Sequence, residues 1–353
     1  MATFAKSTFN AASYAASRPT YPVELFEYIF DYHKRGPAPR WERAVDIGCG
    51  TGQATMQLAP QFKECIGVDP SAGMLEKARA SFKASQVNST TGQSVMDFRV
   101  GGGEDLRGAI PEKESVDLVV AAQAAHWFDW SKTWPEVSRV LSPGGTAAFW
   151  IYAEFRLTDF PSATLIIEDY MRPLGPGCDP AKSIGPHFER PGRTILERHL
   201  VDVPEPLPET GLQALDRVYF CGDDDIPPFV DAASARTKGH IQPILMNKTM
   251  RWRDLLGYFH TFSGLHTYHE RYPADLESPP DTRFAELDGA TKDTGSDEPS
   301  IEGGDIAIRF WKDLRQAALD ATSGKARVGP EDSVQVHWPV ALLLTRKSAI
   351  PSA

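Results

Sequence analysis

Short apolar runs alternate with amphipathic stretches from Trp41 to about Tyr152, and this alternation predicts a parallel sheet wrapped by helical crossovers. Five strands are expected, of which the third is the weakest: 44–47, 64–68, 95–100, 116–120 and 146–150. Three helices are expected between them: 53–59, 72–83 and 133–141. Ser71 is well placed as the N-cap of the second helix. The pattern therefore predicts an α/β fold with a mostly parallel sheet.

The regular alternation ends after Tyr152, where the chain becomes rich in proline and glycine. Helices are expected at 162–171, 251–262 and 306–321, and strands at 215–221 and 334–345. We therefore divide the chain into an N-terminal cap segment (1–40), a core (41–152), an insertion (153–274), an acidic surface loop (275–305) and a C-terminal helix and strand that complete the sheet (306–353).

The charge of the chain is concentrated in one segment. The 353 residues include 37 basic and 47 acidic side chains, which give a formal net charge of -10. Residues 275–305 hold ten acids and two bases, so this segment accounts for most of the excess. Its few apolar residues predict a solvated loop. No basic cluster accompanies the remaining chain's motifs, so we expect no nucleic-acid partner.

Four cysteines lie far apart, at positions 49, 65, 178 and 221, and none belongs to a Cys-x-x-Cys pair. This spacing predicts neither a disulfide scaffold nor a metal site, and it fits a reducing compartment. No run approaches the roughly 18 apolar residues that span a bilayer. We expect a cytoplasmic protein without a membrane partner, and the sequence leaves its oligomeric state open.

The most informative stretch is Val45–Gln53, which reads VDIGCGTGQ and joins a strand to a helix through three glycines. A dinucleotide fingerprint would need a glycine at Gln53, and no Gly-Lys-Ser/Thr follows as in a phosphate-binding loop. Asp69 ends the second strand, where a carboxylate can accept both hydroxyls of a ribose. The stretch thus combines a glycine turn with a carboxylate that can bind a ribose, and it lacks a phosphate-binding motif. This combination predicts an adenosine ligand that carries no phosphates.

Three stretches together resemble the class I S-adenosylmethionine-dependent methyltransferases: VDIGCGTG (45–52), GVDPSAGMLEKA (67–78) and RVLSPGG (139–145). The resemblance implies a Rossmann-like, mostly parallel seven-stranded sheet with an N-terminal cap helix and a helical lid after strand five that covers the substrate. It implies S-adenosyl-L-methionine as cofactor and S-adenosyl-L-homocysteine as product.

The same resemblance implies which residues bind the cofactor. Asp46 would lie near its amino-acid part, the three glycines would line it, and Asp69 would hold the ribose. Ser71, Met74, Gly103 and Glu104 would approach the adenosine, and Gln123 the donor methyl. The implied set is Asp46, Gly48, Gly50, Gly52, Asp69, Ser71, Met74, Gly103, Glu104 and Gln123.

A narrower resemblance reaches further along the chain. Residues 14–22, the QAAHWF stretch at 123–128 and the helix that contains Trp252 look like the fungal branch that includes trans-aconitate and cantharidin-type methyltransferases. Members of that branch methylate small carboxylic acids, which implies O-methylation of such an acid or of a secondary metabolite. Methylation of a phenol, an amine or a carbon is the second hypothesis. Cofactor binding without methyl transfer, for a structural or rearrangement role, is the third.

Three residues after strand four are candidates for the chemistry. His126 could act as a general base at the open edge of the sheet, or it could simply pack. Gln123 could approach the donor methyl, or it could be an ordinary polar strand end. Trp127 could face a sulfonium or an apolar substrate, since a ring face attracts a cation, or it could belong to a hydrophobic cluster.

Three further residues are candidates for contact with the substrate. Tyr14 and Arg18 lie in a segment that could fold over the pocket, where the guanidinium of Arg18 would fit a carboxylate; the alternative is a surface role at the first helix. Trp252 could form a pocket wall, although an apolar stripe at helical spacing is usually core.

Overall fold

The computed structural model describes residues 19–86, 94–223, 225–289 and 298–349. Tyr14 and Arg18 therefore lie outside the described residues. The chain divides into two compact units. The larger unit comprises residues 20–153, 191–246 and the chain from 339 onward; the smaller comprises residues 154–190 and 247–338. Among the described residues, every helix is too short or too polar to cross a bilayer.

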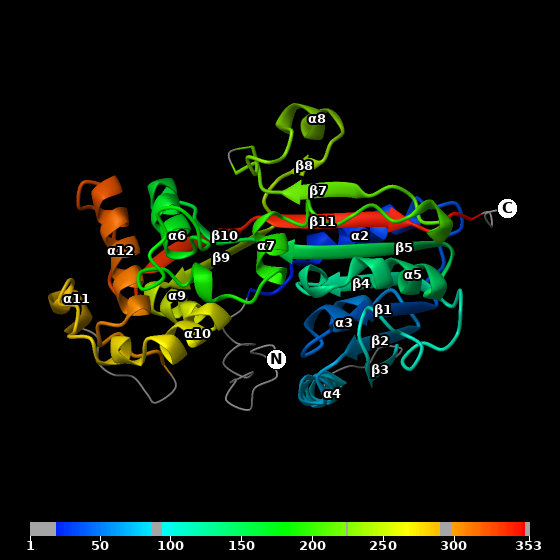
Figure 1. The fold of residues 1–353 in the computed structure, drawn as a ribbon, viewed down its shortest axis with the longest axis horizontal. Coiled ribbons are helices and arrows are strands. Elements are labelled where there is room, and N and C mark those ends of the chain that lie inside the picture. The colour runs from blue at the N-terminus through cyan, green and yellow to red at the C-terminus, as the bar shows by residue number, and fades with distance from the viewer. Residues whose placement is uncertain (1–18, 87–93, 224, 290–297, 350–353) are drawn as a thin grey trace. The chain divides into compact units, whose positions relative to one another are not determined.

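The larger unit is built on an eight-stranded sheet with the order β3-β2-β1-β4-β5-β11-β7-β8 (Figure 1). The strands are β1 (Arg43–Ile47), β2 (Glu64–Asp69), β3 (Val95–Val100), β4 (Val116–Ala122), β5 (Leu141–Tyr152), β7 (Asp216–Phe220), β8 (Ile241–Gln242) and β11 (Val340–Arg346). Strands β1 to β5 run parallel, whereas β11 lies antiparallel between β5 and β7. The predicted count of seven strands is wrong, because the two-residue β8 pairs with β7 at the edge of the sheet.

Central strands of this sheet are buried along almost their whole length, which explains why their sequences are continuous apolar runs rather than alternating ones. Helices flank the sheet, and α8 (Ala232–Thr237) lies beyond its edge strand β8 (Figure 1). The others are α2 (Val23–Lys34), α3 (Gln53–Leu58), α4 (Ala72–Gln86), α5 (Trp130–Val140), α7 (Gly192–Glu197) and the 3-10 turn η2 (Ala125–Trp127). The five predicted strands and three predicted helices of the core are confirmed, with shifts at their ends.

Residues 191–246 belong to the larger unit, although the sequence analysis placed them in an insertion. The apolar run at 334–345 is two strands rather than one. The first, β10 (Ser333–Trp338), lies in the smaller unit, and β11 completes the large sheet. Pro339 separates them, and it has no N–H with which to continue a ladder.

The smaller unit combines a three-stranded sheet with helices. The sheet contains β6 (Arg156–Leu157), β10 and β9 (Met246–Arg251), and the main helices are α6 (Thr164–Tyr170), α9 (Trp252–Phe259), α10 (Ser263–Arg271) and α12 (Ile306–Ala321). The indole N–H of Trp311 donates to the carbonyl of Trp252 at 2.7 Å, and both rings are fully buried. Trp252 is thus part of a hydrophobic core.

The acidic segment is more ordered than a solvated loop. It contains η6 (Pro273–Glu277) and α11 (Ala285–Gly289), and its carboxylates pair with basic side chains of α12. Asp275 bonds Arg309 at 2.9 Å, and Asp288 bonds the fully buried Arg315 at 2.7 Å. A buried guanidinium needs a counter-charge, and composition alone does not show that these carboxylates supply it. The prediction of a wholly solvated loop is wrong for these residues.

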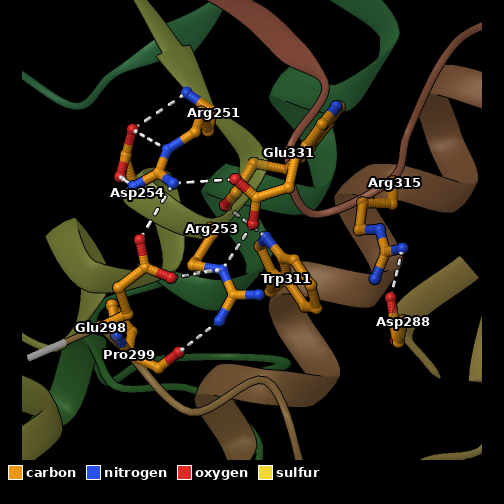
Figure 2. A network of polar contacts seen from close by, with 10 residues as sticks. Arg251, Arg253, Asp254, Asp288, Glu298, Pro299, Trp311, Arg315 and Glu331 are labelled. Atoms are coloured by element: carbon orange, nitrogen blue, oxygen red, sulfur yellow. Dashed lines mark hydrogen bonds and ion pairs between the residues drawn. The ribbon is translucent and has the colours of Figure 1, made fainter. Parts of the chain in front are cut away.

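A second ionic network ties the start of α9 to distant parts of the chain (Figure 2). Arg251 donates to Asp254 at 2.6 Å, to Glu331 at 2.8 Å and to Glu298 at 3.0 Å. The buried Arg253 also donates to Glu331 at 2.8 Å. Glu298, another acid of the segment 275–305, therefore helps to hold the smaller unit together.

Candidate active site

The glycine turn after β1 depends on backbone conformations that side chains rarely adopt. Gly48, Gly50 and Gly52 have φ of +71°, +54° and +82°. A Cβ at Gly48 would lie 2.5 Å from the Cβ of Ala124, so a side chain does not fit there. A Cβ at Gly50 would meet nothing within 4 Å. The turn therefore packs tightly on one side and is open at Gly50.

Asp69 lies at the end of β2 and links the turn to the start of α4. Its Oδ2 accepts the N–H of Gly50 at 2.9 Å, and its Oδ1 accepts the N–H of Ser71 at 2.8 Å. Burial raises the pKa of Asp69, while these two N–H groups act in the opposite direction. Each carboxylate oxygen has a second lone pair, so the group can still accept two hydroxyls. Ser71 also accepts the N–H of Met74 at 3.4 Å and caps α4.

Asp46 lies fully buried in β1, just before the turn. Its Oδ2 accepts the hydroxyl of Thr55 at 2.6 Å, whereas its Oδ1 has no hydrogen-bond partner among the described residues. Burial raises the pKa of Asp46 to about 7. A buried carboxylate oxygen without a partner is costly unless a ligand satisfies it, so Asp46 fits a cationic or hydrogen-bond-donating group.

The segment after β3 has structural partners of its own. The carboxylate of Glu104 accepts the N–H of Asp129 at 3.0 Å, which fixes the start of α5. A Cβ at Gly103 would lie 3.3 Å from the ring of Phe128, so this glycine allows a close approach. Glu104 keeps one carboxylate oxygen beyond this bond, and its contact with adenine remains a prediction.

Gln123 follows β4 and uses its side-chain amide within the protein. Its Oε1 accepts the N–H of Tyr152 at 2.7 Å, and its Nε2 donates to the carbonyl of Tyr152 at 3.2 Å. These bonds join the ends of β4 and β5. Because both polar atoms of the amide already make a hydrogen bond, fewer of its donors and acceptors remain for a ligand.

His126 lies in η2, directly after β4, and is buried. Its Nδ1 has no hydrogen-bond partner among the described residues. Burial, aided by the charge of Arg193, lowers the pKa of His126 to about 3. The imidazole is therefore neutral throughout the physiological range. Trp127 is 42% exposed, and its ring lies within 2.7 Å of an ideal Cβ at Gly192, so only a glycine permits this contact.

The structure brings Asp46, the three glycines, Asp69, Ser71 and Gln123 to the carboxyl edge of one sheet. Trp252 is fully buried within the smaller unit, where its indole N–H donates to the carbonyl of Arg327 at 3.4 Å. A fully buried ring has no face for a substrate, and the prediction of a pocket wall has no support.

Sequence reasoning missed three residues that shape this site: Thr55, Ala124 and Arg193. A threonine in the helix after the turn could have been noticed as a partner for Asp46. No sequence signal indicated that Ala124 packs under Gly48 or that Arg193 lies near His126, since both depend on tertiary contacts.

A parallel sheet with strand order β3-β2-β1-β4-β5, an antiparallel β11 beside β5, a left-handed glycine turn and a carboxylate at the end of β2 define a class I methyltransferase fold. Residues 45–149 match the family described as a methyltransferase domain. Residues 45–149 thus form a methyltransferase domain with the class I fold, and the similarity implies S-adenosyl-L-methionine as its cofactor.

Relatives with the same domain occur in several organisms. The chain is 38% identical over 167 residues to the probable S-adenosylmethionine-dependent methyltransferase CRG1 of Saccharomyces cerevisiae, a match that covers 47% of this chain and 54% of CRG1. It is 30% identical over 141 residues to the methyltransferase cfoB of Aspergillus candidus, covering 40% of this chain and 41% of cfoB. The chain thus spans about half the length of these curated relatives.

A solved structure shows the same fold over most of the chain. A proposed type II methyltransferase from Anaeromyxobacter dehalogenans aligns with 94% of this chain and 99% of its own, with a TM-score of 0.56 and 21% sequence identity. At this identity the likeness extends to the fold alone.

Proposed function

We propose that the protein transfers a methyl group from S-adenosyl-L-methionine to a small molecule, with an oxygen of a carboxylic acid or secondary metabolite as the favoured acceptor. The observation that carries the proposal is the arrangement of Asp69, whose carboxylate bridges the N–H groups of Gly50 and Ser71 beside the open side of the glycine turn. When bound, the cofactor supplies an electrophilic methyl on a sulfonium and leaves as S-adenosyl-L-homocysteine.

Each polar group of the site has a role in this proposal. Asp69 accepts the two ribose hydroxyls through its remaining lone pairs. Asp46 accepts the amino group of the methionine part through its unpartnered Oδ1. The glycines let the backbone approach the ligand, and Ser71, Met74, Gly103 and Glu104 lie near the adenosine.

The state of His126 favours a carboxylic acid as acceptor. A group with a pKa of about 3 holds a proton too weakly to be an effective base near neutral pH. A phenol or an amine needs help to lose its proton, whereas a carboxylic acid is already ionised and can attack the methyl directly. His126 then acts by packing and by excluding water from the reacting atoms.

The proposal is tested by incubating the protein with methyl-deuterated S-adenosyl-L-methionine and a panel of small carboxylic acids, phenols and amines. We expect a labelled methyl ester by mass spectrometry, and His126→Asn should retain turnover within about tenfold because no base is required. A labelled ether or amine would show that the acceptor is a phenol or an amine, as in the second hypothesis, and not a carboxylic acid. Tight S-adenosyl-L-homocysteine binding without any transfer would support a non-methylating role.

Cofactor affinity should depend on pH through Asp46. Below its pKa of about 7 the carboxyl is protonated, and a bound amino group requires that proton to leave. S-adenosyl-L-homocysteine should therefore bind roughly 10-fold more weakly at pH 6 than at pH 8, as measured by calorimetry. Asp46→Asn should bind weakly and without this pH dependence. A wild-type affinity that is flat between pH 6 and pH 8 would remove Asp46 from the site.

A further inference from the structure

Gln123 holds a strained backbone conformation where β4 ends. Its φ is +54°, in the left-handed region that a residue with a side chain adopts only with strain. Three hydrogen bonds to β5 keep it there. Its N–H donates to the carbonyl of Trp150 at 2.8 Å, and its side-chain amide makes the two bonds to the backbone of Tyr152. The side-chain amide thus replaces the backbone N–H and C=O groups of one further residue in the pairing of β4 with β5.

The turn at Gln123 determines where the next residue lies. Ala124 packs directly under Gly48, with 2.5 Å between its Cβ and an ideal Cβ at that glycine. Gly48 in turn donates its N–H to the carbonyl of Val68 at 2.7 Å, beside Asp69. A continuous set of contacts therefore runs from Tyr152 at the end of β5, through Gln123 and Ala124, to the first glycine of the turn.

From these contacts we infer that Gln123 is a positioning residue for the glycine turn, and that it acts through the backbone of Tyr152 and through Ala124 rather than by touching the reacting atoms. The inference rests on the proposed function, which identifies the ligand of the glycine turn as S-adenosyl-L-methionine. Without the side-chain clamp, the left-handed turn relaxes, Ala124 moves, and Gly48 loses the surface that fixes it. Cofactor binding then weakens, while contacts with the acceptor are unaffected.

Two substitutions separate the effect of the two side-chain hydrogen bonds to Tyr152 from the effect of the strained φ at Gln123. In Gln123→Met the side chain has nearly the same length but cannot form the two hydrogen bonds of the amide. Gln123→Gly also lacks them but adopts a positive φ without strain. We expect Gln123→Met to bind S-adenosyl-L-homocysteine about 10-fold more weakly in calorimetry, since it loses two hydrogen bonds and keeps the strained φ. Gln123→Gly loses the same bonds without the strain, so its affinity should lie between those of Gln123→Met and the wild type. The KM for the cofactor should rise by a similar factor, with the acceptor KM unchanged.

Glu114 offers a matched control at the other end of β4. It precedes β4 at the opposite end, has φ of +52°, and pairs with Lys347 at 2.9 Å. Glu114→Met should leave cofactor affinity unchanged even where it lowers the melting temperature. Unchanged affinity in Gln123→Met, or an affinity of Gln123→Gly below that of Gln123→Met, would overturn the inference. A wild-type protein that does not bind S-adenosyl-L-homocysteine would instead contradict the proposed function.

Discussion

Asp69→Asn should weaken the binding of S-adenosyl-L-homocysteine by about 100-fold or more, because the substitution removes the carboxylate charge proposed to hold the ribose and reverses one hydrogen bond. The carboxylate accepts the N–H groups of Gly50 and Ser71 at 2.9 and 2.8 Å. An asparagine amide can accept from one of them, but its NH₂ group would then face the other N–H. The loss thus affects both the bound ribose and the geometry of the turn. Calorimetry at pH 7.5 measures it directly.

Asp97 is a suitable control for this substitution because it lies on the neighbouring β3 and is partly exposed. Its carboxylate accepts from Arg99 at 2.7 Å and takes no part in the glycine turn. Asp97→Asn should bind S-adenosyl-L-homocysteine within about twofold of wild type. Equal affinities for the wild type and a folded Asp69→Asn variant would mean that the ribose does not lie on Asp69.

Gly48→Ala should lower the free energy of unfolding by about 2–5 kcal/mol. The new methyl would lie 2.5 Å from the Cβ of Ala124, and φ of +71° is strained for alanine. Left-handed strain contributes about 1–2 kcal/mol and overpacking about 1–3 kcal/mol. Urea unfolding in the absence of ligand measures this effect separately from cofactor binding.

Two other glycines of the same region serve as controls for this effect. Gly50→Ala should cost only the strain of about 1–2 kcal/mol, since a Cβ there meets nothing within 4 Å, but its methyl should reduce cofactor affinity. Gly73→Ala lies in α4 in open space and should be neutral or stabilising by up to about 1 kcal/mol. A Gly48→Ala protein as stable as Gly73→Ala would contradict the packing of Ala124 under the turn.

The core of the fold is predictable from the sequence because its signals are local. Apolar runs identify the buried strands, and proline and glycine mark their boundaries. The smaller unit is less predictable, since residues 154–190 and 247–338 come together from separate parts of the chain. The acidic segment shows why composition misleads: Asp275 and Asp288 look solvated until their pairing with Arg309 and the buried Arg315 of α12 is known.

The site divides in the same way. Gly48, Gly50 and Asp69 are predictable because a strand end and a glycine turn place them without help from the rest of the fold. For Gln123 and His126 the sequence predicts only the location after β4. Their chemistry depends on burial and on contacts with Tyr152 and Arg193. Burial lowers the pKa of His126, and the sequence alone does not show that burial.

If the carboxyl edge of β1 and β2 binds the adenosine cofactor, a crystal structure of the chain with S-adenosyl-L-homocysteine will show the ligand there. We expect both ribose hydroxyls within 3.2 Å of Asp69, the amino group on Oδ1 of Asp46, and the ligand backbone beside Gly50. Ligand density elsewhere in the protein, with the glycine turn and Asp69 free of it, would contradict the claim.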